Sequence, residues 1–305
     1  MVIFDKVEPG FFGGSDDVEK VEIFYNDKTY IGKFNARFNE NKKKVMMTSY
    51  KNSIYSEYVC SKIIKELGLN VQNVLIGLAN RADGKQREVV ACENFLTDNA
   101  KFVDIKTSII RQNANNNPRY LDDTLFFIRN QKYINPTKLE KFYWEQFSVD
   151  AILGNFDRHN RNWNLLYRVD YKNERYYDLC PIFDNASSLY PFFGEIAMEQ
   201  YLTSKKQVNL ANYPYHSLVD KNNKKISYFD YLSQTNNEIL LKVFSDIYDK
   251  IKFNRINDII NELSGVITDV HINFFKKIFS DRCDLFYEPY QRAKALSKNV
   301  ELKIK

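Results

Sequence analysis

Two stretches decide the fold of this chain: LGNFDRHNRNWN at residues 153–164 and PIFD at residues 181–184. In the first, Asp157 and Asn162 lie five residues apart in a polar run that follows a segment with helical periodicity. A predicted hairpin comes next, and Asp184 follows its second strand after Pro-Ile-Phe. This order of loop, hairpin and acidic loop should bring two carboxylates and one amide oxygen to the same end of a small sheet.

These oxygen-bearing side chains suit the transfer of a phosphoryl group. Magnesium prefers oxygen ligands and usually shares them with substrate phosphates. The transfer also needs a side chain that orients or deprotonates the attacking hydroxyl. In protein kinases a catalytic Asp and a metal-binding Asn are separated by this same interval, with a metal-binding Asp further on. An isolated Asp and Asn in a loop is more often turn chemistry. The motif alone leaves lipid and protein acceptors equally open.

The first hundred residues have the pattern of a small antiparallel sheet that carries one helix. Residues 19–34 alternate apolar and polar side chains around an Asn-Asp turn, which predicts a hairpin. Residues 53–67 have apolar side chains near helical spacing and are followed by a glycine stop signal. Two β-like runs, 71–78 and 87–92, flank a turn. We expect these segments to form the N-terminal lobe.

The remainder of the chain is predicted to be mainly helical. A strong amphipathic segment precedes the DRH motif, which is residues 157–159, and four further segments suit helices; the five ranges are 138–153, 226–251, 255–265, 267–281 and 284–299. The hairpin after the motif is predicted at 163–168 and 175–180. The change of pattern predicts an α+β, bilobal fold, with an N-lobe at 1–97 and a helical C-lobe at 98–305.

Composition limits the other possibilities. With 305 residues, 44% hydrophobic and 27% charged, the chain has the make-up of a soluble globular protein. The four cysteines show no CxxC spacing, so neither a zinc site nor a disulfide framework is expected, and a reducing, cytoplasmic setting fits better. No apolar run approaches the roughly 20 residues of a membrane span. Most of the net charge of +5 lies in residues 291–305, which does not favour a nucleic-acid-binding face.

The sequence resembles a known family over most of its length. FDRHNRN at 156–162 is similar to the DRHxxN catalytic loop of phosphatidylinositol kinases and of HipA-like kinases. Five further stretches carry the resemblance to the HipA-like family: FYN…Y..KF at 24–34, SEYV…LGL at 56–69, VVAC at 89–92, PIFD…S.LYP at 181–191 and YFDYLSQTNN at 228–237. The resemblance implies a compact bilobal Ser/Thr kinase without appended domains.

The resemblance assigns roles to the catalytic loop, 155–162, and to the acidic loop. Asp157 would be the catalytic aspartate that accepts or orients the substrate hydroxyl. Asn162 and Asp184 would hold magnesium, and His159 would lie near the transferred phosphate. The residues after Asp184 are Asn-Ala-Ser-Ser instead of Phe-Gly, which departs from eukaryotic-type protein kinases and favours the HipA-like branch.

The resemblance also assigns the ATP contacts of the N-lobe. Lys33 would contact the α- and β-phosphates, and Glu57 would pair with it. A glycine-rich loop over the phosphates would contain Gly13, Gly14 and Ser15, although it departs from GxGxxG and a glycine pair is also common in ordinary turns. Ser15 is additionally a candidate for autophosphorylation. Backbone groups of the hinge, from Glu93 to Phe95, would meet adenine.

Taken together, the sequence predicts an ATP- and magnesium-dependent Ser/Thr kinase that acts on a protein. The alternatives are a lipid or small-molecule kinase and a nucleotide-binding pseudokinase. The short chain without a membrane-binding amphipathic helix argues against the first, and the full set of polar catalytic positions argues against the second. The resemblance further implies a small helix-turn-helix antitoxin as partner, or instead secretion toward host cells.

Overall fold

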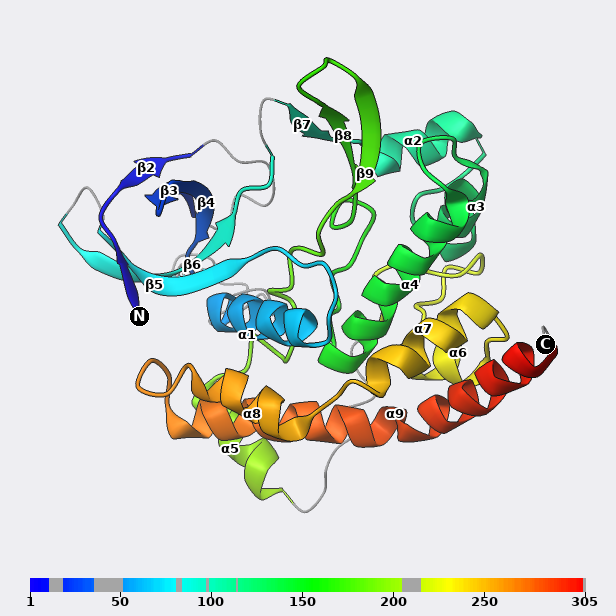
Figure 1. Ribbon diagram of the computed structural model, residues 1–305. Coiled ribbons are helices and arrows are strands. Elements are labelled where there is room, and N and C mark those ends of the chain that lie inside the picture. Colours follow the sequence, from blue (N-terminus) through cyan, green and yellow to red (C-terminus); the bar gives the residue numbers. More distant parts are fainter. Residues whose placement is uncertain are drawn as a thin grey trace. The chain divides into compact units, whose positions relative to one another are not determined.

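The computed structural model of the chain describes residues 1–10, 19–35, 52–80, 84–96, 99–113, 115–204 and 215–303 (Figure 1). By mutual contact the chain divides into two units. The first unit comprises Met1–Phe95, Asp184–Gln207 and Asn254–Lys277, and the second unit comprises Leu96–Phe183, Val208–Phe253 and Ile278–Lys305. The lobes predicted at 1–97 and 98–305 stay a prediction.

The first unit contains a six-stranded sheet with the order β1-β5-β6-β4-β3-β2. Its strands are β1 (Val2–Phe4), β2 (Val7–Pro9), β3 (Lys20–Tyr25), β4 (Lys28–Lys33), β5 (Val74–Asn80) and β6 (Gln86–Glu93). Neighbouring strands pair antiparallel, as predicted, except that β1 pairs parallel with β5. The sequence did not predict β1 and β2, because three residues carry too little alternation to reveal a strand.

The predicted hairpin at 19–34 is formed by β3 and β4. Asn26 and Asp27 connect the strands with φ values of 48° and 58°, the geometry of a type I′ turn. One face of the sheet buries a core of apolar side chains, and the strands curl around it in Figure 1; its members are Phe4, Ile23, Tyr30, Phe34, Ala79, Val89 and Ala91. Because side chains alternate along a strand, Lys33 points to the opposite face.

Helix α1 (Ser53–Glu66) packs against β5 and β6 on that opposite face. It ends at the predicted glycine, Gly68, which has a φ of 78° as is typical after a helix C-terminus. All its residues from Ser53 to Ser61 are buried. The first unit also contains α5 (Glu195–Thr203) and most of α8 (Phe253–Asn261). The hydroxyl of Tyr58 donates a hydrogen bond to Glu262, just beyond α8. A charged side chain in this part of α1 is therefore buried and needs a partner.

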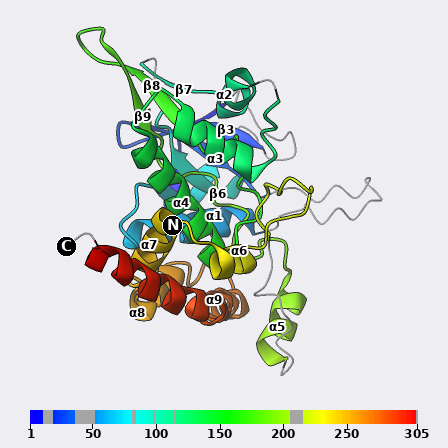
Figure 2. The same cartoon turned by 90° about the vertical axis from the view of Figure 1, so that its right-hand side faces the viewer.

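The second unit combines a three-stranded sheet with helices (Figure 2). The sheet contains β7 (Ala100–Phe102), β8 (Leu165–Val169) and β9 (Arg175–Leu179), of which β8 and β9 are the predicted hairpin. The helices are α2 (Ile105–Gln112), α3 (Leu121–Asn130), α4 (Pro136–Leu153), α6 (Tyr228–Gln234), α7 (Glu238–Tyr248) and the second part of α9 (Asp269–Lys303). The segments predicted as separate helices at 267–281 and 284–299 are one continuous helix, α9.

Helix α4 leads into the DRH motif. Asn135 caps its start by accepting a hydrogen bond from the backbone N–H of Lys138 at 3.1 Å, and Pro136 occupies the first turn. The helix ends at Gly154, whose φ of 70° suits glycine. Its second half is buried on nearly all sides, because α3 and α7 pack against it. The sequence had suggested an amphipathic helix with one solvent face.

None of the helices described here is both long and apolar enough to cross a membrane. The four cysteines are all buried and unbridged.

Gly77 permits the parallel pairing of β1 with β5. A Cβ atom at this position would lie 2.2 Å from the backbone oxygen of Val2, which cannot move aside without separating the strands. We expect Gly77→Ala to lower the free energy of unfolding by about 1–3 kcal/mol, as overpacking typically does. Gly32→Ala is the control, because a Cβ there meets only the side-chain ends of Ile23 and Val21. Urea unfolding should show a smaller loss for the control; equal losses would contradict this explanation.

His216 makes the stability of the second unit sensitive to acid. Its ring lies against Phe147 and Tyr228, with centroid distances of 5.3 and 5.5 Å. Its Nδ1 accepts a hydrogen bond from the backbone N–H of Leu218 at 3.0 Å, which requires a neutral ring. Burial, helped by the charge of Arg158, lowers the pKa of His216 from 6.5 to about 3.

Between pH 6.5, the ordinary pKa of His, and about pH 3, the pKa of His216 in the folded chain, the unfolded chain binds a proton at His216 that the folded chain excludes. The contribution of the neutral His216 to the free energy of unfolding is fully present above pH 6.5. It is lost as the pH falls, at a rate approaching about 1.4 kcal/mol per pH unit. We expect His216→Asn, which keeps an acceptor for the Leu218 N–H, to remove this contribution to the slope. The measurement is urea unfolding at several pH values between 5 and 7, at about the range where an ordinary His titrates. A variant slope equal to that of the wild type would contradict a buried neutral His216.

Candidate functional site

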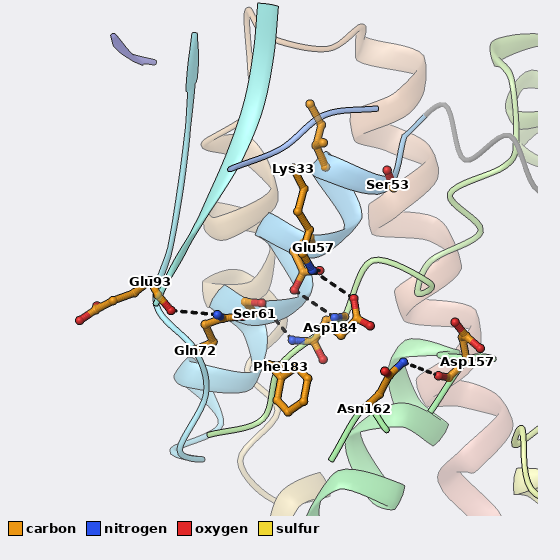
Figure 3. Close-up of polar contacts among 12 residues, drawn as sticks. Lys33, Ser53, Glu57, Ser61, Gln72, Glu93, Asp157, Asn162, Phe183 and Asp184 are labelled. Atoms are coloured by element: carbon orange, nitrogen blue, oxygen red, sulfur yellow. Dashed lines mark hydrogen bonds and ion pairs between the residues drawn. The ribbon is translucent and has the colours of Figure 1, made fainter. Parts of the chain in front are cut away.

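Lys33 and Glu57 form the ion pair that the sequence led us to expect. Lys33 is the last residue of β4, and Glu57 is fully buried on α1. The Nζ atom of Lys33 lies 3.0 Å from Oε2 of Glu57 (Figure 3). The pair is possible because alternation along β4 directs Lys33 to the face of the sheet that α1 covers. A lysine held in this way has a fixed direction.

Asp184 joins this pair. Its Oδ1 atom lies 3.1 Å from Nζ of Lys33, and its side chain is 37% exposed. Burial works against the charged ammonium, but the carboxylates of Asp184 and Glu57 outweigh it and hold the pKa of Lys33 well above its ordinary value. Lys33 is therefore a permanent cation between two carboxylates, one of which is partly open to solvent.

Lys20 adds a second cation that sequence reasoning missed. It stands opposite Lys33 in the register of β3 and β4, so both side chains leave the same face. Burial, together with the charge of Lys33, lowers the pKa of Lys20, while Asp184 opposes that shift. The hairpin prediction contained the signal, because pairing across the Asn-Asp turn places residues 20 and 33 side by side.

The catalytic loop of the second unit is held by hydrogen bonds between its asparagine side chains and its own backbone. The backbone N–H of Asp157 donates to Oδ1 of Asn155 at 2.9 Å, and Nδ2 of Asn162 donates to the backbone oxygen of Asp157 at 2.8 Å. Asn162 also closes a turn through its N–H to the backbone oxygen of His159 at 2.8 Å. The side chain of Asp157 is 49% exposed, whereas Asn162 is buried. The loop thus presents a carboxylate to solvent and fixes its neighbouring amide.

Arg158 and Asp150 anchor this loop, and the sequence analysis gave neither a role. The Nε and Nη2 atoms of Arg158 lie 2.9 and 3.1 Å from the two carboxylate oxygens of Asp150 on α4. Nη1 donates to the backbone oxygens of Asn162, at 2.8 Å, and of Phe183. Burial raises the pKa of Asp150, and Arg158 opposes this shift. The available signal was a lone carboxylate in the apolar run FSVDAIL, which demands a buried partner.

His159 lies at the surface of the same loop. Its side chain is 43% exposed, with Nε2 3.9 Å from Oδ1 of Asp157. Its Nδ1 accepts a hydrogen bond from the backbone N–H of Arg161 at 3.2 Å. The next residue, Asn160, is structural: it is buried, donates to Thr124 and accepts from the indole N–H of Trp163. A role for His159 near phosphate stays a prediction.

The predicted hinge begins at the end of β6. The backbone N–H of Glu93 donates to the backbone oxygen of Asn73 at 2.8 Å, and its oxygen accepts from Nε2 of Gln72 at 2.9 Å (Figure 3). The N–H of Asn94 donates to Thr29. Both backbone groups of Glu93 therefore have partners within the first unit. The expected contacts of the hinge with adenine stay a prediction.

Gly13, Gly14 and Ser15 lie outside the described residues. The other predicted residues fall into two groups: the first unit brings together Lys33, Glu57 and Asp184, and the second unit brings together Asp157, His159 and Asn162. In the described parts of the chain no three His, Cys, Asp or Glu side chains gather as a metal cluster. Magnesium usually takes few protein ligands and completes its coordination with water and phosphate oxygens, and the metal roles of Asp184 and Asn162 stay predictions.

Comparison with known proteins shows the family. Residues 18–262 match the HipA-like C-terminal domain, which is most of the chain. The chain belongs to the HipA-like family.

Its similarity to one solved and curated relative extends further. The chain is 36% identical over 276 residues to the serine/threonine-protein kinase CtkA of Helicobacter pylori (strain J99), which covers 89% of this chain and 81% of CtkA. The crystal structure of the H. pylori proinflammatory kinase CtkA matches with a TM-score of 0.79 and 33% identity, over 91% of this chain and 95% of that one. These matches confirm the predicted kinase-type α+β fold and the predicted class of enzyme, a Ser/Thr kinase. The chain is a Ser/Thr kinase of HipA/CtkA type, and such kinases use ATP and a divalent metal.

A more distant likeness concerns the fold alone. HipA of Shewanella oneidensis, solved with HipB and operator DNA, matches with a TM-score of 0.54 and 14% identity, over 94% of this chain and 67% of that one.

Proposed function

We propose that this chain transfers the γ-phosphoryl group of ATP, with magnesium, to a Ser or Thr hydroxyl of a protein. The observation that supports this most is the position of Lys33 between Glu57 and Asp184, at 3.0 and 3.1 Å. One carboxylate is buried and fixes the lysine, whereas the other is partly exposed and open to a metal. This pairing is what a phosphate-binding lysine and a metal-binding aspartate require.

The first unit would bind the phosphates. Lys33 would contact the α- and β-phosphates, with Glu57 holding its direction. Lys20 would add positive charge to the same face. Gly13, Gly14 and Ser15 would cover the phosphates as a glycine-rich loop, and backbone groups of the hinge, from Glu93 to Phe95, would meet adenine.

The second unit would handle the acceptor. Asp157 would orient the hydroxyl and receive its proton as the new P–O bond forms and the bond to the β-phosphate oxygen breaks. Asn162 and Asp184 would hold magnesium, which when bound neutralises charge on the phosphate oxygens. His159 would donate a hydrogen bond near the transferred group. Most of the rate enhancement would come from positioning and electrostatics.

The test is to supply γ-labelled ATP and magnesium with three acceptors: a mixture of unrelated proteins, the chain itself, and phosphatidylinositol vesicles. We expect label on Ser or Thr residues of protein, with mass spectrometry showing whether Ser15 is among them. Label on the lipid alone would contradict the proposed acceptor. Stabilisation by nucleotide without any transfer would identify a pseudokinase.

The partner and the location of the protein are further proposals from the family resemblance. A small helix-turn-helix antitoxin should co-purify with the chain if it acts as HipA-type toxins do. The rival proposal is secretion toward host cells, and fractionation of the producing cells distinguishes it from retention in the cytoplasm.

A further inference from the structure

Asn185 ties the segment after Asp184 to helix α1. Its side chain is 1% exposed, and its Nδ2 atom donates to Oγ of Ser61 at 3.0 Å. Its backbone N–H donates to Oε1 of Glu57 at 3.0 Å. Glu57 and Ser61 are one helical turn apart and so share a face of α1. Figure 3 shows both of them on α1, close to Asp184.

Asp184 itself has an uncommon backbone conformation. Its φ of 60° lies in the left-handed region, which residues other than glycine adopt uncommonly. Such a residue keeps this conformation only where its surroundings hold it there. Here the ion pair with Lys33 holds the side chain of Asp184, and the two hydrogen bonds of Asn185 hold the backbone that follows. Strain of this kind concentrates at functional sites.

The two carboxylate oxygens of Glu57 contact different partners, the ammonium of Lys33 and the backbone of Asn185. Oε2 pairs with Lys33, and Oε1 accepts from the backbone of Asn185. Glu57 is fully buried, so a lost partner cannot be replaced by bulk water. One carboxylate therefore fixes the lysine and the chain beside the aspartate together. Ser61, also buried, supplies the second point of attachment.

We propose that Asn185 is a positioning residue for the metal: with Ser61 it holds the carboxylate of Asp184 in the orientation that binds magnesium. This rests on the proposed function, in which Asp184 is a metal ligand. Asn185 takes over the position that Phe occupies in the Asp-Phe-Gly of ordinary protein kinases. Here the residue after the metal aspartate bonds through an amide to α1.

The experiment compares Ser61→Ala, Asn185→Ala and the double variant with the wild type. The control is Ser56→Ala on the same helix, because the hydroxyl of Ser56 is equally buried but has no hydrogen-bond partner among the described residues. Binding of a fluorescent non-hydrolysable ATP analogue is measured over a series of free Mg²⁺ concentrations. Melting temperatures are recorded for every variant, and Asp184→Ala is included as a reference.

We expect the Mg²⁺ concentration at half-maximal binding to rise roughly 3- to 10-fold in each single variant, the size that one hydrogen bond implies. The double variant should shift no further than the larger single effect, because both changes remove one interaction. Ser56→Ala should leave the midpoint at the wild-type value.

Three results would overturn the proposal: wild-type midpoints in both single variants, additive shifts in the double variant, or an equal shift in Ser56→Ala. A merely structural role would lower the melting temperature of Ser61→Ala and leave its Mg²⁺ midpoint unchanged. The Asp184→Ala variant distinguishes the metal role of Asp184 from the positioning role of Asn185. If Asp184→Ala keeps the wild-type midpoint, the proposed metal role of Asp184 fails. If only Asp184→Ala loses its dependence on Mg²⁺, the positioning role of Asn185 fails alone.

Discussion

Replacing Arg158 by methionine should lower the free energy of unfolding by about 3–5 kcal/mol, because it leaves the buried carboxylate of Asp150 without its charged partner. Arg158 and Asp150 are 2% and 1% exposed and meet through two hydrogen bonds. The same substitution frees the backbone oxygens of Asn162 and Phe183. Phosphotransfer should therefore fall together with stability. Urea unfolding and initial rates measure the two effects.

Arg168→Met is the matched control for this prediction. Arg168 and Asp178 lie 3.8 Å apart and are 29% and 45% exposed, so their pair should contribute less than about 1 kcal/mol. Combining Arg158→Met with Asp150→Leu should recover part of the stability, because no unpaired charge then remains. A loss in Arg158→Met no larger than that in Arg168→Met would contradict the anchoring role.

Asp157→Asn should lower kcat by about 10²–10⁴-fold, the usual contribution of a side chain that positions or accepts the proton in transfer. The variant keeps the shape of the side chain. The backbone contacts of residue 157 with Asn155 and Asn162 do not depend on the carboxylate. Nucleotide binding and stability should therefore stay near wild-type values. The measurement is the initial rate of phosphate transfer at saturating ATP.

Asp178→Asn serves as the control for Asp157, because it removes an aspartate of similar exposure from the same unit. Its kcat should match that of the wild type. If Asp157→Asn retained full kcat, Asp157 could not be the residue that orients the acceptor hydroxyl.

The sequence predicted those parts of the site that local patterns determine. Lys33 faces α1 because β4 alternates, and Asp157 and Asn162 come together because a short loop joins α4 to β8. The family resemblance, and not periodicity, selected Lys33 on the strand and Glu57 among the polar residues of α1. The order of the elements also sufficed for the α+β class.

The parts that were missed depend on contacts between distant residues. Ser61 and Asn185 are 124 positions apart, and no local pattern pairs them. The pair of Asp150 and Arg158 joins a helix to a loop, so it forms only when Gly154 turns the chain back. Helix α4 was predicted to be amphipathic, because the burial of its remaining face depends on α3 and α7.

The most direct test of the central claim is transfer of label from γ-labelled ATP to protein by the wild type and by Asp184→Asn, both in saturating magnesium. We expect label on Ser or Thr residues with the wild type, and loss of this label in a variant that still folds. Equal labelling by the two proteins would contradict the claim that Lys33, Glu57 and Asp184 form the phosphate and metal half of a kinase site.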